Sequence, residues 1–277
     1  MAQVTECSAR VTTIEEYLSA IDKVFAAQGS DTELWYRGQA QKGFNLTPSI
    51  ARGGLNPLFE VVLLSKFKSL AIPYVEPLPG FPLPNGIPPY WHWLFLMQHY
   101  GVPTRLMDWS RDALTALFFA TDPTDPSLTP GIDATVWVLK PTELNKAFTF
   151  YDFLKPGYIP NVEEPAFNQQ FGPDAQPASL KAAAAIGPLN NTRIAAQRGV
   201  FTVFPKEQNV MALNLFDDSS DFLVKICIAW ESFALIQTQL RHYGVTRLSL
   251  FPEIEKVAGE IAQQVKDEGI LDPPAAP

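Results

Sequence analysis

Residues 134–139, Ala134-Thr135-Val136-Trp137-Val138-Leu139, form the stretch that decides the fold class. β-Branched and aromatic residues pack well in a pleated, buried strand, so this stretch predicts a core strand. The alternating residues 200–204 and the apolar run 223–229 predict two more strands, and residues 34–37 predict a short strand that ends at Gly38. The expected sheet therefore collects segments from most of the chain.

Helical periodicity fills the intervals between these strands. A capping box at Thr12 or Thr13, with Glu15 or Glu16 three residues later, predicts an amphipathic helix with apolar residues at 14, 18, 21 and 25. Further helices are expected at 58–70, 90–100, 113–120, 178–185 and 230–243, with Asp108 or Ser110 capping the one at 113–120 and a loop over 158–176. Strands and helices do not alternate strictly. The order predicts an α+β fold with a central mixed or antiparallel sheet flanked by helices.

The chain shows no clean domain boundary, because core-forming segments lie on both sides of every Pro-rich stretch. We expect one domain over residues 1–277, with a core from about 12 to 261. The Pro-rich stretch 73–89 predicts a long surface loop, and residues 270–277 predict a frayed tail.

Composition argues against several classes of protein. Twenty-one Lys and Arg residues against 29 Asp and Glu residues give a net charge of −8, which opposes extended contact with duplex nucleic acid. The longest apolar stretches, of about ten residues, fall short of the ~20 needed to cross a bilayer, and the N-terminus lacks a signal-peptide pattern. Two cysteines and three histidines show no metal-ligand spacing. These features predict a cytoplasmic protein without a membrane partner or metal, whose thiols are free bystanders.

Three clusters of polar residues in otherwise apolar sequence are the candidate site, because burying polar groups without partners costs free energy. They are Trp35-Tyr36-Arg37-Gly38-Gln39, the segment from Gln98 to Trp109, and the segment from Arg193 to Phe201. We expect the three clusters to assemble into one site.

The residue types leave two interpretations open at each cluster. Arg37 is either a charged fork for a phosphate or carboxylate, or a partner of Asp108 that ties a strand to a helix. His99 is either a proton carrier or a structural group at a helix end. Gln197 lies four residues after Arg193 on a helical turn, where its amide can hold a ligand hydroxyl or can belong to an ordinary surface turn.

Several of these segments, taken in order, resemble the FRG domain family. The aromatic-Arg-Gly motif is present as Tyr36-Arg37-Gly38, and it is followed by the segments Gln98–Trp109, Ala116–Ala120, Arg193–Phe201 and Leu250–Pro252. The resemblance extends from about residue 12 to about residue 261 and implies one FRG domain of bacterial or phage type. It leaves the biochemical role of the domain open.

A second resemblance is to ADP-ribosyltransferases, through Tyr-Arg-Gly on a first strand and a buried Phe-Phe-Ala. This resemblance implies a split sheet and NAD as the cofactor, held by Arg37 and Gly38, with Phe118 and Phe119 beside the nicotinamide. It also places Gln197 at the position of the catalytic glutamate. A neutral amide cannot stabilise an oxocarbenium-like ribose by charge, and Asp108 is the alternative source of that charge.

The resulting prediction is NAD-dependent transfer of ADP-ribose to a macromolecule, in a toxin or a defence protein of phage–bacterium conflict. The catalytic candidates are Arg37, His99, Asp108 and Gln197. The NAD-binding candidates are Tyr36, Gly38, Gln39, Gln98, Tyr100, Thr104, Arg105, Phe118, Phe119 and Arg193. The alternative is a non-catalytic domain that binds a ligand or a protein partner, which Gln197 favours. Hydrolysis by His99 with Asp108 ranks last, because no nucleophile is identifiable.

Overall fold

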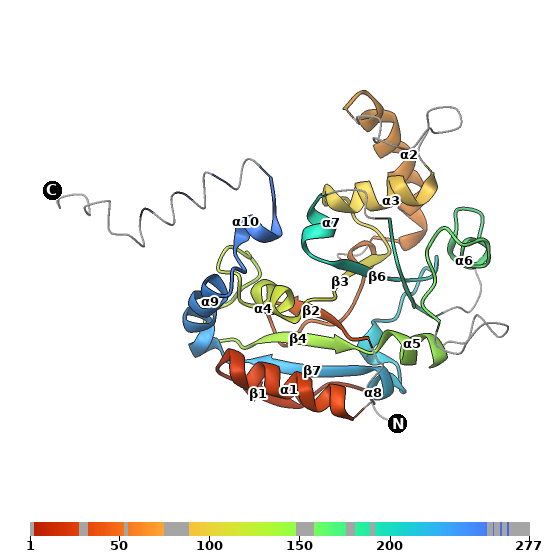
Figure 1. Cartoon of the computed structure of the whole chain (residues 1–277). Coiled ribbons are helices and arrows are strands. Elements are labelled where there is room, and N and C mark those ends of the chain that lie inside the picture. The colour runs from red at the N-terminus through yellow and green to blue at the C-terminus, as the bar shows by residue number, and fades with distance from the viewer. Residues whose placement is uncertain are drawn as a thin grey trace.

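A computed structural model describes residues 3–27, 33–52, 55–74, 89–147, 158–175, 181–188 and 192–253, together with residues 257, 261 and 265. These residues form a seven-stranded mixed sheet flanked by helices, so the predicted α+β class is confirmed (Figure 1). Residues 75–88 of the predicted Pro-rich loop and the tail at 270–277 lie outside the described residues.

The sheet has the strand order β1-β7-β4-β2-β3-β6-β5. Its strands are β1 (Ala9–Val11), β2 (Trp35–Gln39), β3 (Leu106–Ser110), β4 (Ala134–Leu139), β5 (Ala183–Ala185), β6 (Gly199–Val203) and β7 (Leu223–Ile228). β1 runs parallel to β7, and the other neighbouring pairs are antiparallel. Strands from opposite ends of the chain therefore lie side by side, which supports the prediction that the core draws on most of the sequence.

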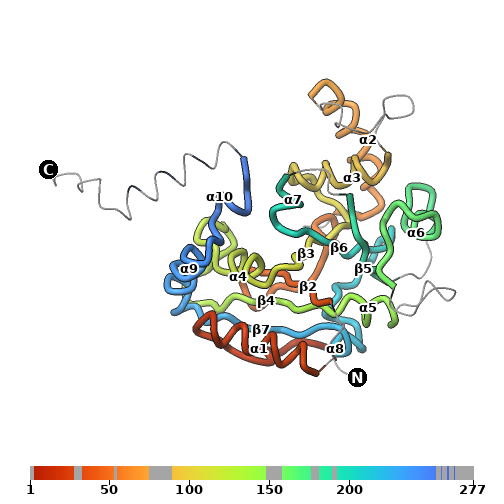
Figure 2. The backbone as a smooth tube through the Cα atoms, viewed as in Figure 1, coloured from red at the N-terminus to blue at the C-terminus, as the bar shows by residue number. Residues whose placement is uncertain are grey.

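Helices α1, α4 and α9 pack against β4 and β7, α3 packs against β5 and β6, and α2 lies beside α3 at one end of the molecule (Figures 1 and 2). The helix bounds are α1 (Ile14–Ala26), α2 (Glu60–Ala71), α3 (Tyr90–His99), α4 (Ala113–Thr121), α5 (Pro141–Ala147), α6 (Pro165–Phe171), α7 (Thr192–Ala196), α8 (Ser219–Phe222), α9 (Phe233–His242) and α10 (Arg247–Leu250). The N-cap of α1 is Thr13, whose side chain accepts from the backbone N–H of Glu16, and the Glu16 carboxylate accepts from the N–H of Thr12 at 2.7 Å. The predicted cap at Thr13 is confirmed, while the return bond of Glu16 comes from Thr12 instead of from the cap residue.

Both faces of the sheet are buried, because side chains alternate between them. Val136 and Val138 of β4 pack with α1, α4 and α9, whereas Trp137 packs in a second cluster on the opposite face. In β6, Phe201 packs with α3 in a third cluster. The central strands are thus apolar on both faces, which explains why residues 134–139 are so strongly apolar.

The sheet is split between β2 and β3. These two strands share one register pair, Tyr36 with Ser110, while β2 pairs with β4 over five positions and β3 pairs with β6 over five. Beyond the single pair, the Nη1 atom of Arg37 donates to the backbone carbonyl of Asp108 at 2.6 Å. A side chain of the first candidate cluster thus replaces a backbone ladder at the split.

Three local predictions are wrong. Asp108 and Ser110 belong to strand β3, and the cap of α4 is Asp112, whose carboxylate accepts from the N–H of Leu114 at 3.0 Å. Residues 183–185 form β5 instead of a helix, because they pair with β6 inside the core. Helix α6 also interrupts the predicted loop at 158–176. For β3 and β5, pairing with β6 overrides the local sequence pattern.

The prediction of two free thiols is also wrong, because Cys7 and Cys227 form a disulfide. Their Cα atoms are 5.6 Å apart, although 220 residues separate them in the sequence. The parallel pairing of β1 with β7 brings these residues together. Among the described residues, no helix is both long and apolar enough to cross a membrane.

Candidate functional site

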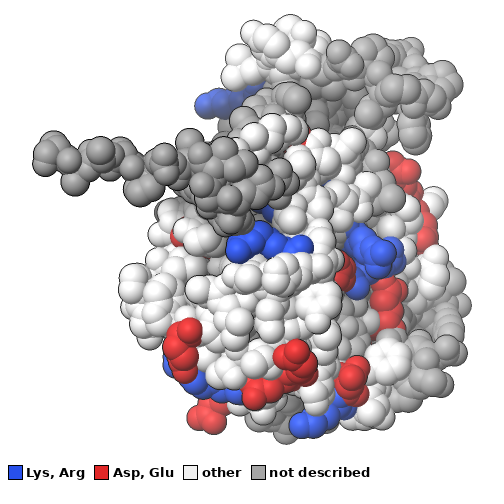
Figure 3. Space-filling view, turned by 60° about the vertical axis from the view of Figure 1, so that its left-hand side comes forward, with Lys and Arg blue, Asp and Glu red and all other residues white. Residues whose placement is uncertain are grey.

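A cavity of about 380 Å³ lies over the split between β2 and β3. Its walls come from β2, β3, α3, α4 and α7, and they include residues of all three candidate clusters. The predicted site residues that line it are Tyr36, Arg37, Gly38, Gln98, His99, Asp108, Phe119, Arg193 and Gln197. Near the middle of the face shown in Figure 3, two groups of basic side chains lie beside an acidic one. The tertiary structure therefore brings the three clusters around one cavity.

Arg37 presents unpaired hydrogen-bond donors at this cavity. Within the described part of the chain, its side chain makes one hydrogen bond, from Nη1 to the Asp108 carbonyl, and its buried Nε atom has no partner. Burial lowers the pKa of Arg37, the Asp108 carboxylate opposes that shift, and the charge of Arg52 adds to it. Arginine nevertheless stays protonated in proteins. Arg37 is thus a charged group with capacity for a further acceptor.

Asp108 is held by side chains of its own segment and does not bond Arg37 through its carboxylate. Its Oδ1 atom accepts from Nε2 of Gln98 at 2.6 Å, and Oε1 of Gln98 accepts from the hydroxyl of Thr104. The interpretation of Arg37 and Asp108 as a paired side-chain brace is wrong, because the bond goes to the backbone carbonyl. The carboxylate instead points a fixed negative charge at the cavity.

His99 and Arg193 lie together at the α3 and α7 side of the cavity. Burial lowers the pKa of His99, the charge of Arg193 lowers it further, and Glu253 opposes both. The guanidinium of Arg193 stacks on the ring of Phe251, 4.4 Å from its centroid. Among the described residues, neither His99 nor Arg193 hydrogen-bonds a carboxylate. The neutral form of His99 is therefore favoured at pH 7, and Arg193 is a second unpaired cation in the same cavity.

Gln197 lies on the turn that follows α7. Its backbone N–H donates to the carbonyl of Arg193 at 2.9 Å, which confirms that the two residues share one side of a helical turn. Its side-chain Nε2 donates to the carbonyl of Leu250 at 3.0 Å. The amide nitrogen is thus used to hold α10, and the amide oxygen is the atom left for a ligand.

Residues 32–127 match the family model of the FRG domain. This part of the chain is therefore similar to the FRG domain. The matched region contains the Tyr36-Arg37-Gly38 motif and the whole Gln98–Trp109 segment, which supply much of the cavity wall. Neither the curated proteins nor the solved structures include a match to the chain. The extent of the domain beyond residues 32–127 stays a prediction.

The glycine of the FRG motif serves packing against a helix. A Cβ atom at Gly38 would lie 2.1 Å from the carbonyl oxygen of Ala116 and 2.5 Å from the backbone nitrogen of Ala120. Only glycine allows α4 to approach β2 this closely. The two phenylalanines of α4 also differ, because Phe119 lines the cavity while Phe118 is buried in the core beside it. The prediction that Phe118 faces a ligand is wrong.

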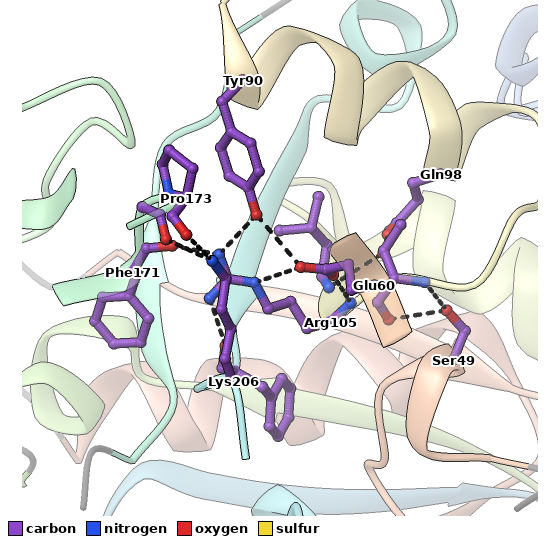
Figure 4. A network of polar contacts seen from close by, with 12 residues as sticks. Ser49, Glu60, Tyr90, Gln98, Arg105, Phe171, Pro173 and Lys206 are labelled. Atoms are coloured by element: carbon purple, nitrogen blue, oxygen red, sulfur yellow. Dashed lines mark hydrogen bonds and ion pairs between the residues drawn. The ribbon is translucent and has the colours of Figure 1, made fainter. Parts of the chain in front are cut away.

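The expectation that Arg105 binds a cofactor is wrong as well, because Arg105 is buried and bonded on all sides within the protein (Figure 4). Its Nε atom lies 2.9 Å from a carboxylate oxygen of Glu60, which is also buried, and its backbone N–H donates to the other carboxylate oxygen at 2.8 Å. Its remaining donors reach the carbonyls of Phe204 and Phe171 and the hydroxyl of Tyr90. Each of the three guanidinium nitrogens has a partner within the protein, so Arg105 is structural.

Three further candidates lie outside the cavity. Gln39 accepts from the indole N–H of Trp137 at 2.7 Å. Thr104 is buried, and its hydroxyl orients Gln98, so it acts on the site only through another residue. Tyr100 is exposed at the end of α3, with its ring near Phe67. A residue next to a site residue in the sequence therefore need not line the cavity, because the direction of its side chain decides whether it does.

Sequence analysis missed Asp125 and Arg52. Asp125 lines the main cavity, and Arg52 lines a smaller cavity that adjoins it. Both residues lie in loops where a charged residue is ordinary, so no sequence pattern singles them out. Among the described residues, no group of three His, Cys, Asp or Glu side chains is arranged to hold a metal ion.

Proposed function

We propose that this protein binds NAD in the cavity at Arg37 and transfers ADP-ribose to a macromolecular acceptor. The observation that carries the proposal is the guanidinium of Arg37, which lines the cavity and donates one hydrogen bond within the described residues, to the Asp108 carbonyl. A charged guanidinium with donors left over at a cavity can bind an anionic group. The diphosphate of NAD is such a group.

The charge distribution in the cavity supports a diphosphate ligand. Arg37 and Arg193 both line it, and neither bonds a carboxylate within the described residues. Asp108 and Asp125 line the same cavity, so its charged groups balance, but both guanidinium groups remain without a bonded carboxylate in the described part of the chain. Guanidinium groups bind phosphate oxygens through parallel N–H donors. Two of them match the two charges of a diphosphate.

The cavity also offers aromatic surface for a nicotinamide ring. Tyr36 and Phe119 both line it, on neighbouring elements. Aromatic side chains pack against flat rings in offset or edge-on arrangements. A ligand with anionic and aromatic parts fits this mixed lining better than a simple anion does.

Asp108 supplies the negative charge that the reaction needs. In the proposed step the glycosidic bond between the ribose C1′ atom and the nicotinamide nitrogen breaks, and nicotinamide leaves as a neutral molecule with the bonding electron pair. The acceptor nucleophile forms the new bond to C1′, and its proton passes to the Asp108 carboxylate. The same carboxylate stabilises the oxocarbenium-like ribose, while the Gln197 amide oxygen accepts from a ribose hydroxyl.

Nicotinamide release by the purified full chain tests the proposal. We expect wild-type protein to release nicotinamide from NAD and Arg37→Gln to bind NAD at least tenfold more weakly. Asp108→Asn is expected to bind NAD within about twofold of wild type and to release nicotinamide about a hundredfold more slowly. Arg198→Gln is the matched control, because Arg198 is exposed and lines neither cavity.

A non-catalytic nucleotide-binding domain is the second candidate, and one observation favours it. Gln197 is neutral, and its amide nitrogen is already bonded to the Leu250 carbonyl. NAD binding that depends on Arg37, without nicotinamide release, would support this candidate. If NAD fails to bind at all, both candidates are wrong.

A further inference from the structure

A second cavity, of about 150 Å³, adjoins the first at the β2–β3 split. Arg37, Gln98, Gly101 and Asp108 line both cavities, so they form the common boundary. The lining that belongs to the second cavity includes Arg52 and the hydroxyl residues Thr47 and Ser49. A molecule in the second cavity therefore lies next to the Asp108 carboxylate and next to the ligand of the first cavity.

The second cavity is lined by two cations and one carboxylate. Arg52 makes no ion pair or side-chain hydrogen bond within the described residues, and the Arg37 side chain bonds only the Asp108 carbonyl. Two guanidinium groups at one small cavity repel each other unless an anion lies between them. The Asp108 carboxylate offsets part of this repulsion, but it accepts from Gln98 and, among the described residues, makes no ion pair with either arginine.

The hydroxyl groups differ in their availability. Ser49 is committed to the backbone of Thr104, since its hydroxyl donates to the Thr104 carbonyl at 3.1 Å and accepts from the Thr104 N–H at 3.0 Å. The Thr47 hydroxyl has no partner in the described part of the chain. The cavity therefore combines two free guanidinium edges with one free hydroxyl donor.

We propose that the second cavity binds a phosphate monoester group of the acceptor, held by Arg52, Arg37 and the Thr47 hydroxyl. A tetrahedral dianion suits this set, because its three terminal oxygens accept from donors that converge from different sides. A cavity of about 150 Å³ suits a phosphate group and leaves little room for the rest of the acceptor, which must extend outward. The assignment of this phosphate to the acceptor rests on the proposed ADP-ribosyl transfer. In that reaction NAD and the acceptor both lie next to Asp108, which lines both cavities.

Calorimetric titration of the full chain with inorganic phosphate tests the site. We expect Arg52→Gln to weaken phosphate binding at least tenfold and Thr47→Val to weaken it about threefold, as loss of a charged and a neutral hydrogen bond predicts. Arg193→Gln, which changes only the first cavity, and Arg198→Gln, which changes neither, are expected to stay within about twofold of wild type. Arg52 is exposed, so its substitution leaves the fold intact, and circular dichroism checks this.

Three results would overturn the proposal. If Arg193→Gln weakens phosphate binding as much as Arg52→Gln does, phosphate binds in the first cavity. If wild-type protein shows no saturable binding, or if Arg52→Gln binds like wild type, the second cavity has no phosphate site.

A parallel titration with NAD separates this proposal from the proposed function. NAD binding is expected to be unchanged in Arg52→Gln and weakened at least tenfold in Arg37→Gln. If phosphate binding depends on Arg52 while NAD does not bind to wild type, the phosphate site is supported and the proposed transfer reaction is wrong. If NAD is turned over but phosphate does not bind, the reaction stands and the phosphate site falls.

Discussion

Arg105 and Arg37 lie at two neighbouring strands of one sheet, yet their guanidinium groups have opposite surroundings. Arg105 is 1% exposed and uses its donors on Glu60, on two backbone carbonyls and on the Tyr90 hydroxyl. Arg37 uses one donor on a backbone carbonyl and leaves Nε without a partner, at the edge of two cavities. One arginine completes the core, and the other is left with capacity for a ligand.

The difference shows how a structural arginine can be told from a binding one. Both residues stand in segments that the FRG-domain model matches, so family membership does not separate them. The number of donors already satisfied inside the protein does. A buried arginine whose nitrogens are bonded inside the protein belongs to the core, and removing one of its partners destabilises the folded state. An arginine with unbonded donors at a cavity can instead bind a ligand.

Loss of Arg105 is the largest effect expected from this comparison. Arg105→Met leaves the Glu60 carboxylate buried without its cation, and we expect the free energy of unfolding to fall by about 3–5 kcal/mol in a urea titration. The double variant Arg105→Met with Glu60→Leu removes the unpaired charge and is expected to recover part of that loss. A loss below about 1 kcal/mol for the single variant would show that Arg105 is not a core ion pair.

Gly38→Ala tests whether the neighbour of Arg37 is structural. The added Cβ would collide with the backbone of α4, so we expect a loss of about 1–3 kcal/mol in the free energy of unfolding. Gly43→Ala is the matched control, because a Cβ there meets no atom within 4 Å, and its effect is expected to stay within about 0.5 kcal/mol. Equal effects at the two glycines would contradict the close approach of β2 and α4.

Arg37→Gln is expected to change stability little and binding strongly. Its loss removes one hydrogen bond, so the free energy of unfolding should change by less than about 1 kcal/mol. NAD affinity, measured by calorimetry, should fall at least tenfold, because a charge-assisted bond to the diphosphate is lost. A destabilisation as large as that of Arg105→Met would place Arg37 in the structural class and remove the basis of the proposed site.

The smallest effect expected is a pH dependence of NAD binding through His99. Burial and Arg193 hold the pKa of His99 below its ordinary value of about 6.5 in the free protein, and a bound anion would raise it. The complex then binds more protons than the free protein, so affinity is expected to rise, by about threefold, as the pH falls from 7.5 to 5.5. His99→Gln should flatten this dependence. An affinity that falls with acid in a His99-dependent way would show that the anion does not approach His99.

The amino-acid sequence by itself determined the fold class, the five longest helices of the described residues and the three polar clusters that meet at the cavity. The strand at 134–139 and the helix that begins after Thr13 follow from local patterns, because burial on both faces and capping each impose a short-range choice of residue types. The three polar clusters are recognisable for the same reason, since polar residues in apolar surroundings need a partner or a ligand.

The tertiary structure alone decided which arginine is free. Glu60, the partner of Arg105, is 45 residues away in the sequence, and the disulfide of Cys7 joins residues 220 positions apart. Strand β3 likewise forms because its neighbour β6 supplies the ladder, not because residues 106–110 favour it. Partners so distant in sequence leave no periodic pattern, and whether a charged side chain is satisfied depends on all the groups that pack around it.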